Sequence, residues 1–443
     1  MLDCTYRVQV RHCSGMLAKA ASVIGEHEGL IGDMVTVNLG RDATIRELTV
    51  QVSADDHAER IAGALGEIDG IEVLWHRDRA FMRHEGGKLE IDTRFEVKTL
   101  QDTRDMYTPG VARVAQAIAD DPSQARHYTM IGRTVAICTN GSRVLGLGDV
   151  GPVAAMPVME GKAVFYRQFA GISAMPILID THDPDEFVET VERIAPSFGG
   201  IHLEDISAPE CLEIERRLRD ELAVPVMHDD VHGTAVVTLA AAIVAARQVD
   251  VDLREATVGQ IGLGAAGAGI AELMVDGGAG HVLASDPDES THGRAHDKGI
   301  EIAELGELMA KSNVVVATTG QPGLIEPGMV SDGQVILAMS NPDPEIRPDD
   351  ALEAGAAFAL DGSSVNNVLG YPGVFRGALL SGAEDINLEM KLAAARAIAD
   401  LAEQSELVPD PLDPEVHAHV AEAVCQAAEE SGAARPELAA TGL

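Results

Sequence analysis

The sequence predicts an α/β protein made of a small βαββαβ module, a mixed α/β segment and a doubly wound segment. Short apolar runs alternate with helical stretches through most of the 443 residues, which is the pattern of βαβ units. A glycine-rich turn joins a predicted strand to a helix in the second half of the chain. Residues 1–82 differ from the rest of the chain, because alternating apolar and polar residues, typical of strands, dominate there. The length gives room for two or three domains, each with its own core.

The first segment, residues 1–82, is predicted to be the βαββαβ module. Alternating apolar and polar residues predict four strands, over residues 6–10, 30–39, 44–52 and 71–76. One helix opens at Gly15, where apolar residues recur at helical spacing, and a second helix covers residues 54–65. Residues 85–88, Glu-Gly-Gly-Lys, are predicted to be a linker. This order of elements indicates a ferredoxin-like fold.

The remaining chain is predicted to form two further domains. Residues 88–222 have a mixed α/β pattern, and residues 232–435 have a doubly wound pattern. Helices over residues 386–401 and 416–430 close the chain. Alternating strands and helices predict parallel sheets, which bind their ligands at the carboxyl ends of the strands.

The charge of the chain limits its partners. It has 71 acidic residues against 33 basic ones, which gives a formal net charge of −38. This charge disfavours nucleic acid and anionic membranes as partners. Only seven residues are lysines, and an acid-rich, lysine-poor surface is typical of halophile proteins, whose carboxylates are screened by salt. The alternative is a non-halophilic source with a high-GC genome, which also exchanges lysine for arginine.

We find no targeting or membrane segment in the sequence. Residues 1–11 carry charges and lack the apolar core of a signal peptide, and no apolar run approaches the ~20 residues that span a bilayer. The cysteines lack the spacing of a metal site or a disulfide framework. They are Cys4, Cys13, Cys138, Cys211 and Cys425. These features predict reduced thiols, no membrane partner and a cytoplasmic location.

Two acidic pairs stand where apolar runs end, and they are the most informative feature of the chain. The pairs are Glu204-Asp205 and Asp229-Asp230, with a helical stretch between them. If both runs are parallel strands, the four carboxylates meet at one edge of a sheet. They would repel one another unless a cation neutralised them, and oxygen ligands alone suit Mg²⁺ or Mn²⁺ better than zinc. The alternative is that they are solvated loop acids.

A second motif predicts a dinucleotide site. A predicted strand over residues 257–261 leads into a Gly-x-Gly-x-x-Gly turn, followed by a helical stretch. The turn residues expected at the pyrophosphate are Gly262, Gly264, Ala265, Ala266 and Gly267. The next strand, residues 281–285, delivers Asp286, whose carboxylate can bind both ribose hydroxyls and would repel a 2′-phosphate. NAD is therefore favoured over NADP. A glycine-rich turn without a ligand is the alternative.

Four further residues carry no clear signal by themselves. Taken singly, Lys162 is typical of a surface charge, and Tyr107, just before a tight turn and a helix, of a packed aromatic residue. Asn341 and Asn367 lie in Ser-Asn-Pro and Asn-Asn sequences, which are common in turns. Spacing alone assigns none of them a function.

The chain resembles the malic enzymes of the bacterial and archaeal type over roughly residues 88–435. The motifs that carry the resemblance occur in the family's order, at residues 107–112, 146–149, 160–163, 203–209, 228–230, 232–235, 340–342, 366–368 and 372–373. The segment before them resembles an ACT domain, a small-molecule-sensing module, through its pattern and through Gly15 and Gly29. The resemblance implies a Rossmann NAD-binding domain in the doubly wound segment.

The resemblance also implies a role for the residues at the acidic site. The expected metal ligands are Glu204, Asp205 and Asp230. Lys162 would be the general base, paired with Asp229, and Tyr107 would be the general acid. A desolvated Lys162 beside a cation would have a lowered pKa and could take a hydroxyl proton.

The expected substrate contacts come from three other positions. Arg143 would hold a substrate carboxylate, and Asn341 and Asn367 would hydrogen-bond malate, with Asn341 also at the cofactor. Val231 departs from the family, which usually has glutamine there. Hydrogen bonding around the metal ligands is expected to differ for that reason.

These observations predict an NAD- and metal-dependent malic enzyme. It would convert (S)-malate and NAD⁺ to pyruvate, CO₂ and NADH, with malate and pyruvate as partners, and it would form a homodimer or higher homo-oligomer. The ACT-like module would bind a small-molecule effector, and a purely structural dimerisation domain is the alternative. A malolactic enzyme with the same residues is one rival. An amino-acid dehydrogenase with a regulatory domain is a second rival, but it would have no use for the acidic site. A non-catalytic sensor is the non-enzyme alternative, and the intact set of candidate catalytic residues argues against it.

Overall fold

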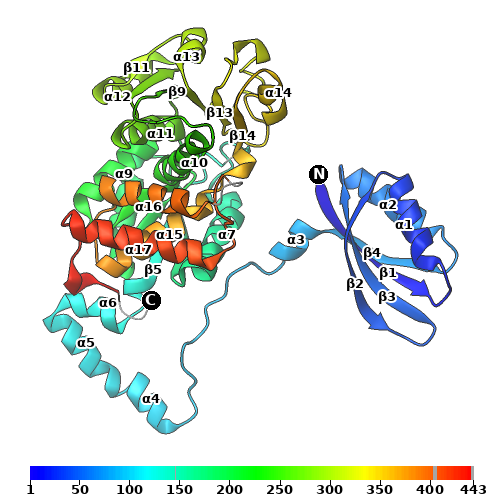
Figure 1. Ribbon diagram of the computed structural model, residues 1–443. Helices are drawn as coiled ribbons and strands as arrows, with labels where there is room; N and C mark the ends of the chain where they lie inside the picture. The colour runs from blue at the N-terminus through cyan, green and yellow to red at the C-terminus, as the bar shows by residue number, and fades with distance from the viewer. Residues whose placement is uncertain (145, 403–406, 441–443) are drawn as a thin grey trace. The chain divides into compact units, whose positions relative to one another are not determined.

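The computed structural model describes residues 1–144, 146–402 and 407–440. The chain forms two compact units, Met1–Ile91 and Asp92–Leu443, which we refer to as the N-terminal unit and the large unit. In Figure 1 the N-terminal unit is a single sheet with helices, coloured blue, and the large unit runs from cyan to red.

The N-terminal unit has the predicted βαββαβ order. Its elements are β1 (Leu2–Arg11), α1 (Met16–Glu26), β2 (Leu30–Leu39), β3 (Ala43–Val52), α2 (Asp55–Gly66) and β4 (Ile71–Asp78). The strands form an antiparallel sheet in the order β2-β3-β1-β4, and both helices cover one of its faces (Figure 1). A short helix that was not predicted, α3 (Arg79–His84), follows the sheet.

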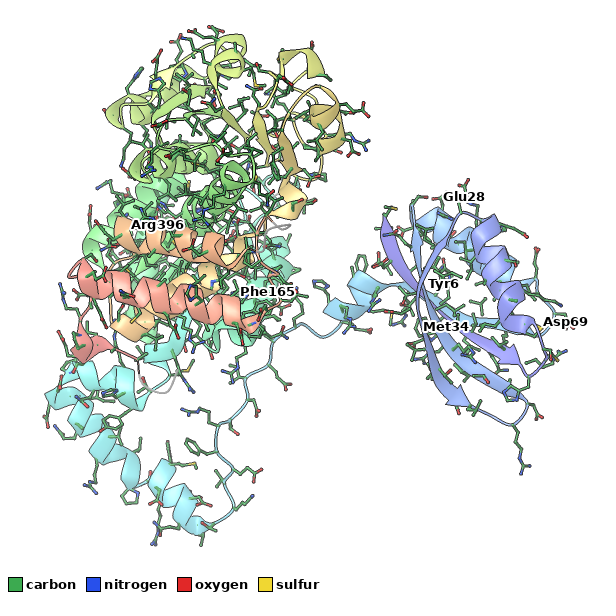
Figure 2. All side chains as sticks on the ribbon, in the orientation of Figure 1. Tyr6, Glu28, Met34, Asp69, Phe165 and Arg396 are labelled. Carbon is green, nitrogen blue, oxygen red and sulfur yellow. The ribbon has the colours of Figure 1, made fainter. Side chains whose placement is uncertain are left out.

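The strands of this sheet differ in burial. Tyr6 and Val8 on β1 pack with Val50 on β3 and Ile61 on α2 in one buried apolar cluster. All ten residues of β2, by contrast, are exposed. Figure 2 labels the buried Tyr6 and the exposed Met34 on this unit. Because β2 is an edge strand, it leaves one row of backbone N–H and C=O groups unpaired and can accept another strand.

The large unit begins with short helices, followed by the first of two parallel sheets. The helices are α4 (Leu100–Met106), α5 (Gly110–Asp120) and α6 (Ala125–Tyr128). The strands are β5 (Thr134–Thr139), β6 (Ser173–Leu178), β7 (Gly200–Leu203) and β8 (Val226–His228), in the order β6-β5-β7-β8. Their connecting helices are α7 (Pro152–Ala170), α8 (Pro184–Ile194) and α9 (Glu210–Glu221). The two acidic pairs therefore follow adjacent parallel strands, β7 and β8.

The second sheet is doubly wound, as predicted. Its strands are β9 (Thr257–Ile261), β10 (His281–Ser285), β11 (Glu301–Ile302), β12 (Val314–Ala317), β13 (Val335–Ala338) and β14 (Phe358–Asp361). They are parallel, in the order β11-β10-β9-β12-β13-β14. The connecting helices include α11 (Ala265–Asp276), α12 (His292–Asp297), α13 (Leu305–Lys311) and α14 (Pro348–Glu353). The strand order reverses between β9 and β12, which is where such sheets bind ligands.

One apolar core joins the two sheets of the large unit. It runs from Val135 on β5 through Leu239 on α10 (Thr234–Gln248) to Val316 on β12. Three further helices complete it: α15 (Tyr371–Ser381), α16 (Leu388–Leu401) and α17 (Pro414–Glu430). Residues 229–248 are long and apolar enough to cross a membrane by composition, but 78% of that window is buried, as in a core helix. The predicted domain division at residues 222–232 stays a prediction.

Candidate active site

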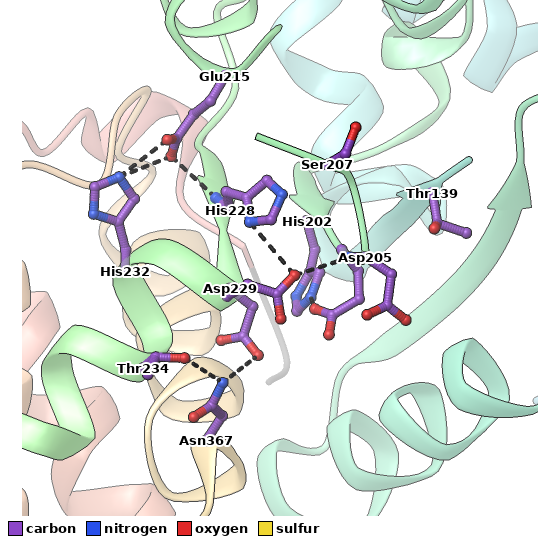
Figure 3. Close-up of polar contacts among 12 residues, drawn as sticks. Thr139, His202, Asp205, Ser207, Glu215, His228, Asp229, His232, Thr234 and Asn367 are labelled. Carbon is purple, nitrogen blue, oxygen red and sulfur yellow. Dashed lines mark hydrogen bonds and ion pairs between the residues drawn. The ribbon is translucent and has the colours of Figure 1, made fainter. Parts of the chain in front are cut away.

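Two pairs of acidic residues meet at the carboxyl ends of β7 and β8. Glu204-Asp205 follows β7 and Asp229-Asp230 follows β8, and the parallel pairing of the strands sets these ends side by side. Carboxylate oxygens of Glu204, Asp205 and Asp230 lie within 4.8 Å of one another. Figure 3 shows Asp205 and Asp229 converging at this edge.

The donor set of this cluster fits a hard divalent cation. Asp205 Oδ2 is buried and makes no hydrogen bond, while the backbone N–H of Asp205 donates to Asp230 Oδ2 at 2.9 Å. Burial raises the pKa of Glu204, Asp205 and Asp230, and repulsion from the neighbouring carboxylates raises it further. A bound cation would remove this repulsion and give the orphaned oxygen a partner.

Lys162, on α7, lies beside this cluster. Its Nζ donates to Asp229 Oδ2 at 2.7 Å and pairs with Glu204 Oε1 at 2.9 Å. The ring of Tyr371 faces the ammonium, with its centroid 4.7 Å from Nζ. Burial lowers the pKa of Lys162, but attraction to Asp229 and Glu204 outweighs burial and holds this pKa well above its ordinary value. The lowered pKa expected from the sequence depends on a cation that offsets these carboxylates.

A second trio of potential metal ligands overlaps the first. Ligand atoms of His202, Glu204 and Asp229 also lie within 4.8 Å of one another. The Lys162 ammonium contacts Glu204 and Asp229, so this trio already has a positive charge beside it. We therefore place the candidate metal site at Glu204, Asp205 and Asp230.

Two of the other predicted residues adjoin this cluster. Asn367 Nδ2 donates to Thr234 Oγ1 at 3.0 Å and to Asp229 Oδ2 at 3.4 Å, as Figure 3 shows. The backbone N–H of Arg143 donates to the carbonyl of Asp205 at 3.1 Å, and the Arg143 side chain is exposed. Asn367 thus orients the Asp229 carboxylate, which holds Lys162. The backbone of Arg143 is hydrogen-bonded to Asp205, so Arg143 is anchored next to a candidate metal ligand.

Tyr107 is not brought to this cluster in the single chain. It directly follows α4, its side chain is 71% exposed, and its hydroxyl has no hydrogen-bond partner among the described residues. Its neighbours Leu100, Met106 and Val111 are exposed as well. Exposed apolar surface of this kind marks an interaction site for a protein, a membrane or a ligand.

The glycine-rich turn between β9 and α11 has the geometry of a phosphate cradle. Gly262 has a φ of 88°, a conformation that favours glycine, and the third glycine, Gly267, allows close packing, since a Cβ there would lie 2.0 Å from the Gly262 carbonyl. A Cβ at Gly264 would meet open space, so a ligand can approach that backbone closely. Asp286, after β10, accepts a hydrogen bond from Leu263 N at 2.6 Å and so lies against the turn. This arrangement fits a bound dinucleotide.

A buried carboxylate that sequence reasoning missed ties together two loops of the second sheet. Glu345 is fully buried and accepts hydrogen bonds from Thr319 Oγ1 at 2.8 Å and Ser340 Oγ at 2.6 Å. Thr319 follows β12 and Ser340 follows β13, so Glu345 fixes the loop that carries Asn341. The only sequence signal for Glu345 is its position, four residues after the predicted site residue Asn341.

Val231 packs the helical turn Asp229–Gly233, which carries two of the acidic residues, against α11, the helix that follows the glycine-rich turn. It is fully buried, and a Cβ at Gly269 on α11 would lie 2.7 Å from the Val231 carbonyl and 2.8 Å from its Cγ1. The Val231 side chain thus fills the space left by the missing side chain at Gly269. Position 231 therefore faces an apolar contact and has no need of a polar residue.

The cluster is supported from behind by side chains that the sequence analysis did not single out. His202 on β7, Tyr166 on α7 and Tyr371 on α15 are all buried. His202 lies two residues before Glu204, so the alternation of a strand puts both on one face. That spacing is the signal that would have found it.

Two family models match the chain. The model for the malic enzyme N-terminal domain matches residues 91–219, which hold the first sheet up to α9. The model for the malic enzyme NAD binding domain matches residues 288–431.

Individual relatives extend this similarity along most of the chain. The NAD-dependent malic enzyme 1 of Bacillus subtilis is 49% identical and covers 96% of this chain and 97% of its own length. The NAD-dependent malic enzyme of Geobacillus stearothermophilus is 39% identical and covers 98% and 96%. The crystal structure of malic enzyme from Pyrococcus horikoshii is 36% identical, with a TM-score of 0.75, and covers 79% of this chain and 88% of that chain. The two bacterial matches are long enough to include most of the N-terminal unit.

Proposed function

Because this chain belongs to the malic enzyme family, we propose that it converts (S)-malate and NAD⁺ to pyruvate, CO₂ and NADH with a divalent cation, Mg²⁺ or Mn²⁺. The observation that carries the proposal is the position of Lys162. Its Nζ lies within 2.9 Å of carboxylates from two adjacent strand ends, beside three oxygen donors that fit a cation. A base next to a cation site is what deprotonation of a chelated hydroxyl requires.

In the proposed reaction, Lys162 takes the proton of the malate C2 hydroxyl. Asp229 and Glu204 hold its Nζ in place, and Asn367 orients Asp229. When bound, the cation supplies the positive charge that makes the hydroxyl more acidic and that stabilises the enolate after CO₂ leaves. When bound, NAD⁺ supplies the hydride acceptor for C2.

Other residues of the chain would position the substrate and return a proton. Arg143, Asn341 and Asn367 would bind malate so that the C2 hydrogen faces the nicotinamide. Loss of the proton and the hydride gives oxaloacetate, a β-keto acid, which loses CO₂. Tyr107 would then protonate C3 to give pyruvate.

The exposed position of Tyr107 supports an enzyme made of several copies of this chain. Tyr107 and its neighbours on α4 and α5 are exposed in the single chain, and their apolar surface needs a cover. We infer that the chain is a homodimer or higher homo-oligomer in which this segment is covered. Tyr107 can reach a substrate only where that segment meets an active site, of its own chain or of another copy.

We propose that the N-terminal unit is an ACT-like module that pairs and senses a small molecule. Its exposed apolar edge strand, with Leu30 62%, Val35 54% and Leu39 74% exposed, supports pairing with another copy. Gly15 has a φ of 81°, and a Cβ added there would meet nothing within 4 Å, so a ligand can approach the backbone at the start of α1 from that side. A purely structural pairing role is the alternative, and screening amino acids and central metabolites for an effect on malate kinetics separates the two.

The direct test of the activity is an assay of NADH and pyruvate formation from (S)-malate, with and without Mn²⁺. We expect equal amounts of both products and no turnover when Mn²⁺ is removed with a chelator. Lactate without net NADH would identify a malolactic enzyme instead. Replacing NAD⁺ by NADP⁺ should reduce the rate, because Asp286 would repel a 2′-phosphate. A preference for NADP⁺ would contradict the assignment of Asp286.

A further inference from the structure

His202 holds the oxygen of Glu204 that faces away from Lys162. His202 Nε2 lies 2.7 Å from Glu204 Oε2, and Tyr166 Oη lies 2.8 Å from His202 Nδ1. His202 and Tyr166 are fully buried, and Glu204 is 3% exposed. The result is a buried series of hydrogen bonds from α7 through β7 to the candidate metal site.

For a neutral His202 ring, the donors and acceptors in the Tyr166–His202–Glu204 series can be assigned in one way. A carboxylate can only accept, so His202 Nε2 must carry the hydrogen and donate it to Glu204 Oε2. His202 Nδ1 is then an acceptor, and the Tyr166 hydroxyl donates to it. A neutral imidazole carries one hydrogen, so a ring that donates from Nε2 accepts at Nδ1. By donating to Nδ1, Tyr166 favours the tautomer that carries its hydrogen on Nε2, which faces the carboxylate.

The arrangement matters because Glu204 has two tasks. Its Oε1 pairs with Lys162 at 2.9 Å, and the same side chain is one of the three donors proposed for the cation. Without a donor on Oε2, that buried oxygen would lack a partner, and the carboxylate could turn both oxygens toward the Lys162 ammonium. A carboxylate turned in that way is a poorer ligand for a cation at Asp205 and Asp230.

We propose that His202, oriented by Tyr166, is a positioning residue that holds Glu204 so that it can serve Lys162 and the metal together. This inference rests on the proposed function, because it takes Glu204 as a metal ligand. It differs from ligation by His202 itself, since the proton on Nε2 leaves no lone pair there for a cation.

The test is Mn²⁺ affinity of the full-length protein, measured by isothermal titration calorimetry in the absence of malate and NAD⁺. We expect His202→Leu to weaken Mn²⁺ binding about 10- to 100-fold, as is usual when a partner of a metal ligand is lost. His202→Gln places an N–H near the position of Nε2 and should restore affinity to within about threefold of wild type. Tyr166→Phe should weaken Mn²⁺ binding less than His202→Leu does. The His202 ring stays in place in that variant, and only the control over its tautomer is lost.

A second buried histidine provides the matched control. His417 is fully buried, its Nε2 lies 2.9 Å from the Pro411 carbonyl, and its ring stacks on Phe169. His417→Leu should lower the melting temperature without changing the Mn²⁺ affinity. If His202→Leu does not fold, the Gln and Phe variants still test the proposal through their affinities.

The outcomes separate this proposal from the proposed function. Wild-type protein that binds no Mn²⁺ would overturn the metal site itself. Normal wild-type binding together with unchanged affinity in His202→Leu, or in Tyr166→Phe when the Leu variant is unfolded, would overturn only the role of His202. Loss of affinity in His202→Gln as large as in His202→Leu would also overturn it, because a donor would then not suffice.

Discussion

The two units of this protein differ in whether they bury charged groups: both have exposed ion pairs, but among the described residues only the large unit buries a cluster of carboxylates. In the large unit, Glu204, Asp205 and Asp229 are buried, and a carboxylate oxygen of Glu204 lies within 4.8 Å of one on Asp205 and of one on Asp229. In the N-terminal unit, charged groups lie at the surface, as in the exposed pair of Arg60 with Asp56. Buried like charges oppose folding unless something neutralises them, whereas exposed pairs contribute little either way. The comparison supports the proposal that the buried carboxylates of the large unit serve the reaction and that the N-terminal unit acts through its surface.

The strongest test of this contrast is removal of the Lys162 ammonium, which lies beside the buried carboxylates. Lys162→Ala should lower kcat by about 10²- to 10⁴-fold, the usual contribution of a general base, and leave NAD⁺ affinity unchanged. Lys311→Ala is the matched control, because that lysine is 54% exposed and pairs with Glu307 on the same helix. The measurement is steady-state NADH formation together with NAD⁺ titration. Activity of Lys162→Ala within a factor of about two of wild type would remove it from the mechanism.

Mixing two inactive variants shows whether Tyr107 works across copies. Tyr107→Phe and Lys162→Ala should each have little malate activity alone. If Tyr107 reaches the active site of another copy, co-expressed mixed oligomers regain activity, because some sites then combine an intact Tyr107 with an intact Lys162. We expect this recovery, since Tyr107 is exposed in the single chain. Mixed oligomers as inactive as the parents would place Tyr107 at its own chain's site.

The buried carboxylates also predict how metal binding depends on pH. Burial raises the pKa of Asp205 from 3.8 to about 8. Because the folded state then binds protons more tightly than the unfolded state, the metal-free protein loses stability as pH rises through about 4 to 8. Mn²⁺ needs these groups deprotonated, so the increase in melting temperature on adding Mn²⁺ should be larger at pH 8 than at pH 6.

Two variants check that this gain arises at the proposed site. Asp230→Asn should lose most of the Mn²⁺ stabilisation, because a charged ligand becomes neutral. Asp55→Asn, at the start of α2 in the N-terminal unit, should keep it. Equal gains at both pH values, or a full gain in Asp230→Asn, would contradict the assignment.

For the N-terminal unit, the comparison predicts a change in assembly and little change in chemistry. Val35→Lys puts a charge on the exposed edge strand β2 and should weaken pairing between copies. Leu74→Lys is the control, because Leu74 is 41% exposed on β4, the other edge of the sheet. Light scattering after size-exclusion chromatography should show dissociation for Val35→Lys alone, with malate kinetics within about twofold of wild type. An unchanged mass would rule out β2 as the pairing surface.

The smallest predicted effect concerns the surface as a whole. With 71 acidic and 33 basic residues, self-repulsion should weaken the fold at low ionic strength, where the Debye length is ~30 Å at 0.01 M salt. We expect the melting temperature to rise as KCl increases from tens of millimolar toward molar. A flat response would favour a high-GC, non-halophilic source over salt adaptation.

The elements and the acidic site could be predicted because their signals are local. The predicted strand over residues 281–285 coincides with β10, and the helix predicted over 54–65 is shifted by one residue in α2. Glu204 and Asp230 were found because strand ends at one edge of a parallel sheet must come together. Periodicity and strand ends need no knowledge of distant contacts.

The residues that could not be predicted are those whose role depends on distant contacts. Tyr166 looks like an ordinary core position, and its contact with His202 joins residues 36 apart. His202 itself had a local signal, its spacing from Glu204 on one strand, which was overlooked. Glu345 was missed because a buried carboxylate is recognised by its donors, Thr319 and Ser340, which come from two other strand ends. The family resemblance assigned a role to Tyr107, but no local pattern places the helix before it against an active site.

The contact between Val231 and Gly269 has a mechanical consequence. A side chain at position 269 on α11 would collide with the carbonyl of Val231, so the helical turn Asp229–Gly233 lies directly against the helix that begins at the glycine turn. A ligand bound at the glycine turn would therefore lie little more than one helical turn from the segment that carries Asp229 and Asp230, and a shift of α11 would move both together.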